Sequence, residues 1–299
     1  MSDSSSNSAV SIKHECCHSP SSVSDEELRK LTKPIVSQEL ICSVVSSFYG
    51  PATVIQQLDS YDDCNFLVEV NSVRYLLKVH NGVESADYIA AKEDSKIGFA
   101  NALYRHVRSC GILTNEIVPV RYSADVLIPP SPQFQRSSFT QCFQVKEGDD
   151  VSLSELPVLS PLYSPCILAV QMLTWVEGTT MSSSRTLSIE TIADAGIFLG
   201  KLRTTLDEFP EPLPISAKRF HAWDTKNIST LRKFTPFITN ERRRSMVHRI
   251  IDDFETELLP LSQKFPQGIL HGDFNDANVL LDECSNVSAV IDFGDSIYR

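Results

Sequence analysis

The amino-acid sequence predicts an α+β fold in two lobes, a sheet-rich first half followed by a mainly helical second half. Three strand-like runs come early in the chain: residues 52–58, 65–70 and 73–79. The last two are separated only by Asn71-Ser72, which is typical of a tight hairpin. Helical spacing of apolar residues is clearest later, from Ser188 to Leu206. Together these patterns favour an antiparallel sheet followed by helices.

The first residues predict a disordered tail and two helices. Residues 1–24 are rich in Ser and poor in large apolar groups, so they cannot offset the entropy of ordering. A helix is expected from Ser24, a good N-cap that is followed by acids. A second helix is expected after Pro34, ending at Tyr49-Gly50-Pro51.

The middle of the chain predicts a long helix and then mostly loops. The helix is expected from Ser85 to about Cys110, where Gly111 suits its C-terminal end. A short strand is expected at residues 117–120. Residues 123–165 are interpreted as a long loop insertion around one strand at 140–145, because two stretches are rich in Pro. The apolar run 166–173 is expected to be a strand that leads into a hinge at 174–178.

In the second half, apolar residues of the helix at 188–206 are expected to share one face: Ile192, Ala195, Leu199, Leu202 and Leu206. A charged helix is expected at residues 240–259. The predicted division is therefore a tail (1–24), an N-lobe (25–173) and a C-lobe (174–299).

The motif that carries chemistry lies near the end of the sequence. It reads His271-Gly272-Asp273-Phe274-Asn275-Asp276-Ala277-Asn278, and Asp292-Phe293-Gly294-Asp295 follows. A hydroxyl that attacks a terminal phosphate needs a carboxylate near its proton, and divalent metal needs hard oxygen ligands. Asp273 can supply the first, while Asn278 and Asp292 can supply the second. His-Gly-Asp alone would be read as a turn, but the spacing to Asn278 and Asp292 matches phosphoryl-transfer enzymes.

These motifs resemble those of the aminoglycoside-phosphotransferase-like small-molecule kinases, over roughly residues 31–299. Ser60-Tyr61-Asp62-Asp63-Cys64-Asn65-Phe66 and Leu173-Thr174-Trp175-Val176-Glu177-Gly178 carry the same resemblance. It implies a two-lobed protein-kinase-like fold, Mg²⁺, and transfer of the γ-phosphate of GTP or ATP. The implied acceptor is the hydroxyl of an amino alcohol, 5-hydroxy-L-lysine. Choline or an aminoglycoside would fit the same acidic site and stays an alternative.

The resemblance also assigns roles to residues outside the motif. Lys78 would steady the phosphates, Ser60 and Asn65 would touch them, and Asp276 and Asp295 would lie at the acceptor. In the hinge, backbone groups of Thr174 and Trp175 would meet the nucleotide base, although Trp175 is equally well explained as core packing.

Two features depart from the family pattern. Gly98 stands where a glutamate would pair with Lys78, so Glu93 is carried as a substitute, or Lys78 lacks its partner. The second departure is the expected absence of the family's C-terminal helices. The loop at residues 59–65 has no glycine and two adjacent aspartates, which the resemblance tolerates because the family's loop is also acidic, and Asp62 or Asp63 is expected to face solvent, metal or the substrate's ammonium groups. Gly98, and the expectation that the family's C-terminal helices are missing after Arg299, favour an alternative: a catalytically impaired kinase-like binding protein.

Composition narrows the range of partners. The formal charge of −11 argues against general binding of nucleic acid or anionic membrane, and no apolar run is long enough to span a bilayer. Neither a signal peptide nor a transit peptide is expected at the N-terminus, so the predicted location is the cytosol. Eight cysteines without regular spacing are expected to be free thiols, and zinc at His14-Glu15-Cys16-Cys17-His18 is disfavoured. The oligomeric state is left open.

Overall fold

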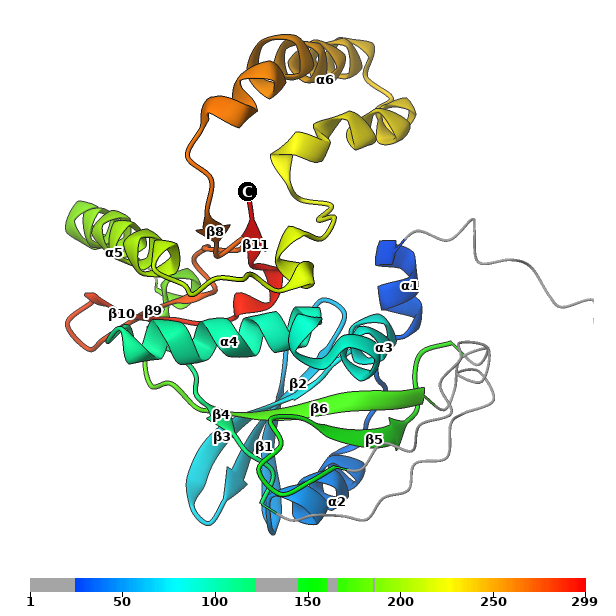
Figure 1. Ribbon diagram of the computed structural model, residues 1–299, viewed down its shortest axis with the longest axis vertical. Coiled ribbons are helices and arrows are strands. Elements are labelled where there is room, and N and C mark those ends of the chain that lie inside the picture. The colour runs from blue at the N-terminus through cyan, green and yellow to red at the C-terminus, as the bar shows by residue number, and fades with distance from the viewer. Residues whose placement is uncertain (1–24, 122–144, 161–165, 185) are drawn as a thin grey trace, which may run out of the picture.

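The computed structural model describes residues 25–121, 145–160, 166–184 and 186–299. The predicted Ser-rich tail and nearly all of the strand predicted at 140–145 lie outside these residues. The two-lobed α+β architecture is confirmed: one sheet with its helices forms one part, and helices with two small sheets form the other (Figure 1).

The large sheet is antiparallel and belongs to the first half of the chain. Its strands are β1 (Ala52–Leu58), β2 (Cys64–Val70), β3 (Val73–Val79), β4 (Ile117–Val118), β5 (Ser152–Leu156) and β6 (Cys166–Thr174). The order is β1-β2-β3-β6-β4, and β5 also pairs with β6. Strand β5 corrects the prediction that residues 123–165 hold a single strand at 140–145. The polar residues in Ser152–Leu156 did not indicate a buried strand. In the structure all of its residues except Ser154 and Glu155 are buried.

The β2–β3 hairpin forms as predicted. Val70 pairs with Val73, and the two turn residues have positive φ, 52° at Asn71 and 62° at Ser72. Two consecutive positive-φ residues match the right-handed twist of the flanking strands, and Asn adopts this conformation more readily than most residues. The hairpin fixes the register that places Lys78 opposite Asn65.

Helices cover the sheet and connect it to the second half. Helix α1 (Asp25–Leu31) lies beside α3 (Gly82–Ala91), and α2 (Gln38–Phe48) packs Ile41, Val45 and Phe48 into the core of the sheet. Helix α4 (Lys96–Ser109) lies between the sheet and the last part of the chain, residues 269–298 (Figure 1). Its residues Phe99 and Leu103 share a core with Ile269, Val290 and Phe293.

The single helix predicted from Ser85 to Cys110 is wrong, since the chain breaks between α3 and α4. Lys92 has φ 49° and Ser95 caps α4 by accepting from the Gly98 N–H at 3.0 Å. The chain folds back so tightly that a Cβ at Gly98 would lie 2.2 Å from the Lys92 carbonyl oxygen. The break therefore requires glycine at position 98.

The second half contains two small sheets and a long helix. One sheet has the order β10-β9-β7, from strands β7 (Thr179–Thr180), β9 (Val279–Leu281) and β10 (Val287–Val290). The other pairs β8 (Ile269–Leu270) with β11 (Ile297–Tyr298). Helix α5 (Ile189–Asp207) forms as predicted, but only part of its apolar face is covered. Leu202 and Leu206 are buried, whereas Ile192 is 57% exposed and Leu199 42% exposed.

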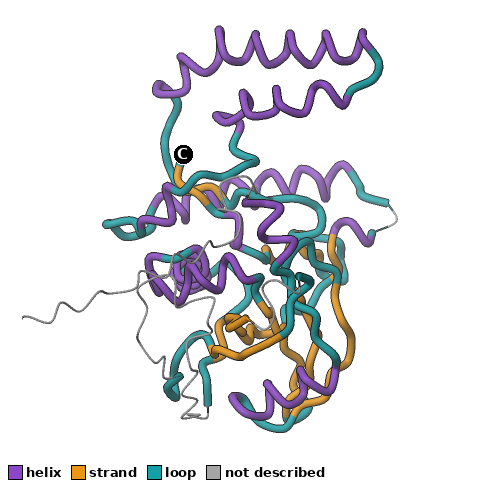
Figure 2. Tube along the Cα trace, turned by 90° about the vertical axis from the view of Figure 1, so that its right-hand side faces the viewer, coloured by secondary structure: helices purple, strands orange, loops and turns teal. Residues whose placement is uncertain are grey.

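Residues 225–264 form an arm that projects from the body of the molecule in both views (Figures 1 and 2). The arm consists of the 3-10 segment Thr225–Phe237, helix α6 (Glu241–Asp253), one π-helical turn and a last 3-10 segment. These elements pack mainly on one another, and Phe234, Phe237 and Ile250 remain exposed.

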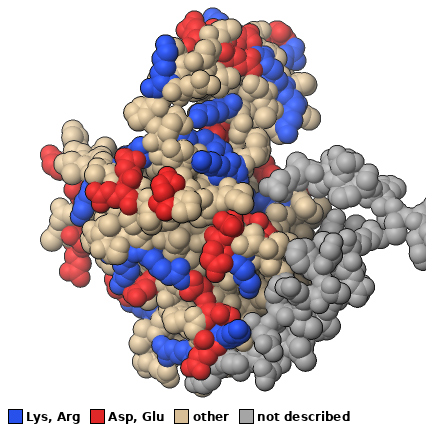
Figure 3. All heavy atoms as spheres, viewed as in Figure 1, with Lys and Arg blue, Asp and Glu red and all other residues tan. Residues whose placement is uncertain are grey.

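Acidic and basic side chains are interspersed over the face shown in Figure 3, without a single-signed surface there. Within the described ranges, no helix is both long enough and apolar enough to cross a membrane.

Candidate active site

The loop between β8 and β9 holds Asp273 and Asn278 together. The Asn278 side-chain amide donates to Asp273 Oδ2 at 2.8 Å and to the Asp273 carbonyl at 2.9 Å. The Asn275 amide donates to the other carboxylate oxygen, Oδ1, at 2.8 Å. Since a carboxylate can accept several hydrogen bonds, these two donors fix its orientation and still leave lone pairs for an acceptor hydroxyl.

His271 sets the start of this loop. Its Nε2 lies 3.1 Å from the Ile291 carbonyl, and its Nδ1 accepts the Asp273 backbone N–H at 3.3 Å. Because a carbonyl only accepts, the proton is on Nε2 and the ring is neutral. Burial lowers the pKa of His271, which favours the same form. The imidazole therefore ties the catalytic loop to the strand end that precedes Asp292.

Gly272 allows the His-Gly-Asp loop and the Asp295 backbone to approach each other more closely than a residue with a side chain would allow. It has φ 85°, and a Cβ there would lie 2.1 Å from the Asp295 carbonyl oxygen. The glycine of His-Gly-Asp thus permits the loop to pass directly against the Asp-Phe-Gly-Asp segment.

Asp292 lies two residues after the end of β10 and pairs with Lys78 of β3. The Lys78 ammonium is 3.2 Å from Asp292 Oδ1 and 3.4 Å from Oδ2. Burial by itself would lower the pKa of Lys78, but Asp292 together with Tyr104, Asp63 and Glu84 outweighs burial and raises the pKa above the usual range. Asp292 has φ 64° and accepts the Gly294 N–H at 3.1 Å. A left-handed aspartate is strained, and this tight turn re-aims its carboxylate toward β3.

Phe293 anchors the turn that presents Asp292. Its ring is buried against Tyr104 of α4, 5.2 Å between centroids, and against His271, 4.7 Å between centroids. These aromatic contacts connect the two motifs to the helix that supports them.

Asn65 and Gln171 lie beside Lys78 on neighbouring strands. Both pair with Lys78 in register, so the three side chains share one face of the sheet. The Gln171 amide donates to Asn101 of α4 at 2.7 Å. Asn65 Oδ1 is buried with no hydrogen-bond partner in the described part of the chain. A buried polar atom without a partner indicates a place for a further donor, such as a bound water or ligand group.

The substitute partner expected for Lys78 does not lie beside it. Glu93 is exposed in the 3-10 turn Lys92–Asp94, whereas Lys78 pairs with Asp292. This proposal for Glu93 is corrected by the break between α3 and α4, which the sequence pattern did not reveal.

Asp62 and Asp63 point inward instead of facing solvent. Asp62 forms an ion pair with Arg29 at 2.6 Å, and Asp63 accepts the backbone and side-chain N–H groups of Asn81 at 2.9 and 3.1 Å. Both are buried. The backbone carbonyl of Ser60, in the same loop, accepts from Lys33 at 2.6 Å.

Asp295 is held by the Lys96 ammonium and by the His221 ring, whose Nδ1 accepts the Trp223 backbone N–H at 3.3 Å. The Lys96 ammonium lies 3.4 Å and His221 Nε2 lies 3.2 Å from its Oδ1. Burial would raise its pKa, but the His221 hydrogen bond and the Lys96 charge lower it below the usual range. Asp295 therefore carries a firm negative charge close to the His-Gly-Asp loop. Asp276, by contrast, is exposed, and its backbone carbonyl accepts the Ser182 N–H at 2.8 Å.

The hinge uses the backbone of Thr174 internally. Its N–H donates to the Glu116 carbonyl at 2.8 Å, and its carbonyl accepts from the Asn115 amide at 3.0 Å. The Thr174 N–H is therefore already used, while its carbonyl oxygen keeps a second lone pair for the proposed contact with a nucleotide base. Trp175 is half-buried at this point.

The donor set around Asp273 fits a divalent hard cation. Asn278 spends its amide N–H groups on Asp273, which leaves the amide oxygen as a possible ligand, and Asp292 adds a carboxylate that already faces a positive charge. The Ile291 N–H donates to the Asn278 carbonyl at 2.9 Å, so the residue before Asp292 lies directly against Asn278. These two side chains are the ones that would hold Mg²⁺.

A buried cluster of charged and polar side chains, which the sequence pattern did not reveal, lies next to this site. Its members are Arg29, His80, Glu84, Lys96 and His221. Only one local signal existed, the spacing of four between His80 and Glu84 at the start of α3.

Comparison with known proteins agrees with this geometry. The sequence profile of the phosphotransferase enzyme family matches residues 54–298. Hydroxylysine kinase of Mus musculus is 25% identical over 89% of this chain, and that of Bos taurus is 27% identical over 93%. The chain spans 66% of the length of each of these relatives.

Solved structures share the fold. A microcompartment-associated aminopropanol kinase superposes with a TM-score of 0.59 and 16% identity, covering 88% of this chain and 70% of the other. The GDP complex of an aminoglycoside 2'-phosphotransferase variant gives 0.55 and 14% identity, covering 88% and 74%. With the matched profile extending over most of the sequence and over every motif described above, the chain belongs to the phosphotransferase enzyme family.

Proposed function

We propose that this protein is a small-molecule kinase that transfers the γ-phosphoryl group of GTP or ATP to the hydroxyl of 5-hydroxy-L-lysine. The observation that carries the proposal is the contact of Asp273 with Asn278, beside the ion pair of Asp292 with Lys78. This arrangement combines a carboxylate for the acceptor, oxygen ligands for metal and an ammonium for phosphate. The similarity to hydroxylysine kinases supports the choice of acceptor.

In the proposed reaction, the acceptor hydroxyl oxygen attacks the γ-phosphorus while its proton is held by the Asp273 carboxylate. A new O–P bond forms, the bond from the γ-phosphorus to the β–γ bridging oxygen breaks, and a nucleoside diphosphate leaves. Lys78 places its charge on the phosphate oxygens, and Asn275 and Asn278 keep Asp273 oriented. Mg²⁺, held by Asn278 and Asp292, would neutralise phosphate charge.

Asp295 and Asp276 are proposed to lie at the acceptor side, where a cationic amino alcohol suits acidic residues. Asp295 is already balanced by Lys96 and His221, so it is better suited to shape this side than to bind an ammonium alone. For the base, Trp175 is the proposed hinge contact. Asn65 keeps its proposed role as a phosphate contact, which its side-chain N–H groups would make, since its Oδ1 and the phosphate oxygens are all acceptors. Ser60 keeps its proposed role as a phosphate contact. A cytosolic location belongs to the same proposal.

One observation favours the non-catalytic alternative. Gly98 has no space for a side chain, so the acid that pairs with the strand lysine in the family cannot occur at this position. A binding protein built on this fold would still bind nucleotide but would not transfer its phosphoryl group.

The test is the release of nucleoside diphosphate by purified protein with GTP and with ATP, in the presence of Mg²⁺ and a panel of amino alcohols. Release that depends on 5-hydroxy-L-lysine supports the proposal. Release only with choline or an aminoglycoside selects another acceptor. Binding of nucleotide without any acceptor-dependent release selects the non-catalytic alternative.

A further inference from the structure

The β1–β2 loop (residues 59–63), which the proposed function places over the nucleotide phosphates, has no glycine to shape it. Its shape depends instead on side chains that turn inward. Asp62 and Asp63 are both buried, although two neighbouring carboxylates repel each other and burial disfavours their charge. Each must therefore be compensated by a partner outside the loop.

Those partners come from two helices. Arg29 of α1 reaches Asp62 with its Nε at 2.6 Å and Glu84 of α3 with its terminal nitrogen at 2.7 Å. Asp63 is held at the start of α3, where Asn81 donates to it from both the backbone and the side chain. A single guanidinium thus joins the loop to α3 through an ion pair with Asp62 and a hydrogen bond to Glu84, two contacts that separate nitrogens of its planar group make at once.

Lys33, just after α1, holds the loop backbone. Its ammonium donates to the carbonyls of Ser60 and Tyr61 at 2.6 and 3.1 Å. In a trans peptide the C=O and N–H point in opposite directions, so the N–H groups of Tyr61 and Asp62 are aimed away from Lys33. Backbone N–H groups aimed together are suited to phosphate oxygens.

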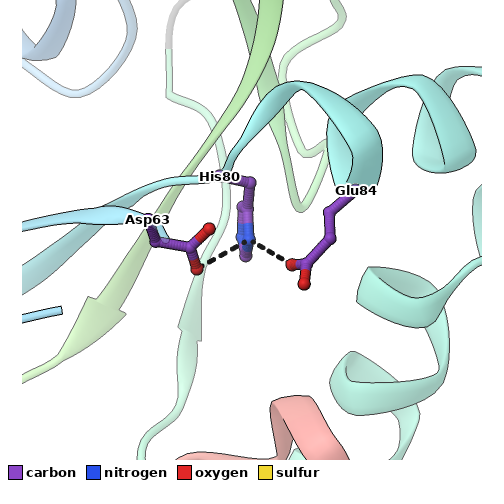
Figure 4. A group of neighbouring side chains, drawn as sticks. All are labelled: Asp63, His80 and Glu84. Atoms are coloured by element: carbon purple, nitrogen blue, oxygen red, sulfur yellow. Dashed lines mark hydrogen bonds and ion pairs between the residues drawn. The ribbon is translucent and has the colours of Figure 1, made fainter. Parts of the chain in front are cut away.

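Glu84 forms ion pairs with His80 and Lys96, and Figure 4 shows Glu84 with His80 and Asp63. His80 Nδ1 lies between Glu84 Oε2 at 3.3 Å and Asp63 Oδ2 at 3.5 Å. The spacing of these three side chains would suit a metal ion, but Glu84 Oε1 already accepts from Arg29 and from Lys96 at 2.5 Å. Asp62, Asp63 and Glu84 carry three negative charges, and Arg29 and Lys96 carry two positive charges. One further positive charge, on a protonated His80, balances the cluster, whereas a divalent ion would exceed it.

We propose that Arg29, assisted by Lys33, is a positioning residue that holds the β1–β2 loop in its nucleotide-binding shape by acting through Asp62. This inference rests on the proposed function, since it assumes that the loop meets nucleotide. Arg29 and Lys33 both precede residue 54, where the match to the family profile begins.

The test compares Arg29→Gln, Asp62→Asn and the double variant with wild type. Arg232→Gln serves as the matched control, because Arg232 forms a comparable double ion pair with Asp252 and Glu255 in the distant arm. We expect the nucleotide KM of Arg29→Gln to rise about tenfold, a loss of about 1.4 kcal/mol, while the acceptor KM changes less than twofold. Adding Arg29→Gln to Asp62→Asn is expected to raise the nucleotide KM by less than a further twofold.

Hydrogen exchange gives a second readout that needs no nucleotide. The amides of residues 60–63 are expected to exchange faster in Arg29→Gln and in Asp62→Asn than in wild type and Arg232→Gln. Unchanged loop exchange, or equal rises in both KM values, overturns the inference. If wild type binds no nucleotide, the proposed function fails. Hydrogen exchange of the loop then decides by itself whether Arg29 positions the β1–β2 loop. If Arg29→Gln does not fold, Asp62→Asn decides it.

Discussion

Lys78 and Asp292 form an ion pair that joins the large sheet to the Asp-Phe-Gly-Asp segment, with Nζ 3.2 Å from Oδ1. The two residues are separated by 214 positions in the sequence. In the proposed reaction both charges act on the same nucleotide, Lys78 on its phosphates and Asp292 through metal. The pair therefore positions the two groups before the nucleotide arrives.

Replacement of Asp292 by Asn is expected to reduce kcat by at least about a hundredfold, because charge stabilisation at a phosphoryl group is removed. The fold should persist, since the Asp292 side chain is partly exposed and the turn is anchored by Phe293. Steady-state rates with the thermal midpoint measure both effects. A kcat within threefold of wild type would contradict the role of Asp292 as a metal ligand.

Replacement of Asp273 by Asn separates chemistry from binding. We expect kcat to fall about 10²–10⁴-fold, the usual contribution of a positioned acid or base, while the nucleotide KM changes less than threefold. Asp253→Asn on the exposed side of α6 is the matched control and should behave as wild type. A parallel loss of nucleotide affinity in Asp273→Asn would indicate a binding role instead.

Restoring the family's acid by Gly98→Glu is expected to damage the protein. A Cβ at this position would collide with the Lys92 carbonyl at 2.2 Å, and overpacking of this kind costs at least about 1–3 kcal/mol of unfolding free energy. Gly196→Ala in α5 is the control, because a Cβ there meets nothing within 4 Å and alanine favours helix. Chemical denaturation of both variants measures the difference. A Gly98→Glu variant as stable as wild type would show that the chain between α3 and α4 can move to make space for a side chain.

His80 predicts a pH dependence of stability. Burial would lower its pKa, but Asp63 and Glu84 raise it to about 9. The folded pKa lies above the unfolded value of 6.5, so this stabilisation is complete below pH 6.5 and is lost as pH rises through about 9. The loss amounts to at most about 3 kcal/mol.

The measurement is the unfolding free energy of wild type and His80→Gln between pH 6 and 9.5, with His248→Gln on α6 as control. We expect wild type and the control to lose stability over this window and His80→Gln to lose less. Equal slopes for all three proteins would mean that His80 is neutral in the folded state, which would reopen the metal interpretation of its cluster.

The sequence predicted those parts of the fold that depend on local signals. Asn71-Ser72 marked a hairpin because turn chemistry acts within four residues, and Ser188 marked the start of α5. The contact of Asp273 with Asn278 was expected because both lie on one short stretch, whose spacing brings them together. The catalytic role of Asp273 and the metal-binding roles of Asn278 and Asp292 stay predictions.

Features that depend on distant contacts were not predictable in this way. Asp62 and Asp63 were expected to face solvent or ligand, because their buried partners Arg29 and Asn81 lie on other elements. The break before α4 depends on how the Lys92 carbonyl approaches Gly98, and no pattern in the sequence reports that distance. Strand β5 was missed because pairing with β6 outweighs its polar residues.

The central claim is tested most directly by following the phosphorus atom. Protein incubated with Mg²⁺, γ-labelled GTP or ATP and 5-hydroxy-L-lysine should yield a labelled phosphate ester of the amino acid, equal in amount to the nucleoside diphosphate released. The Asp273→Asn variant should yield almost none. Label that stays in the nucleotide, or that appears only as inorganic phosphate from wild type, would contradict the account.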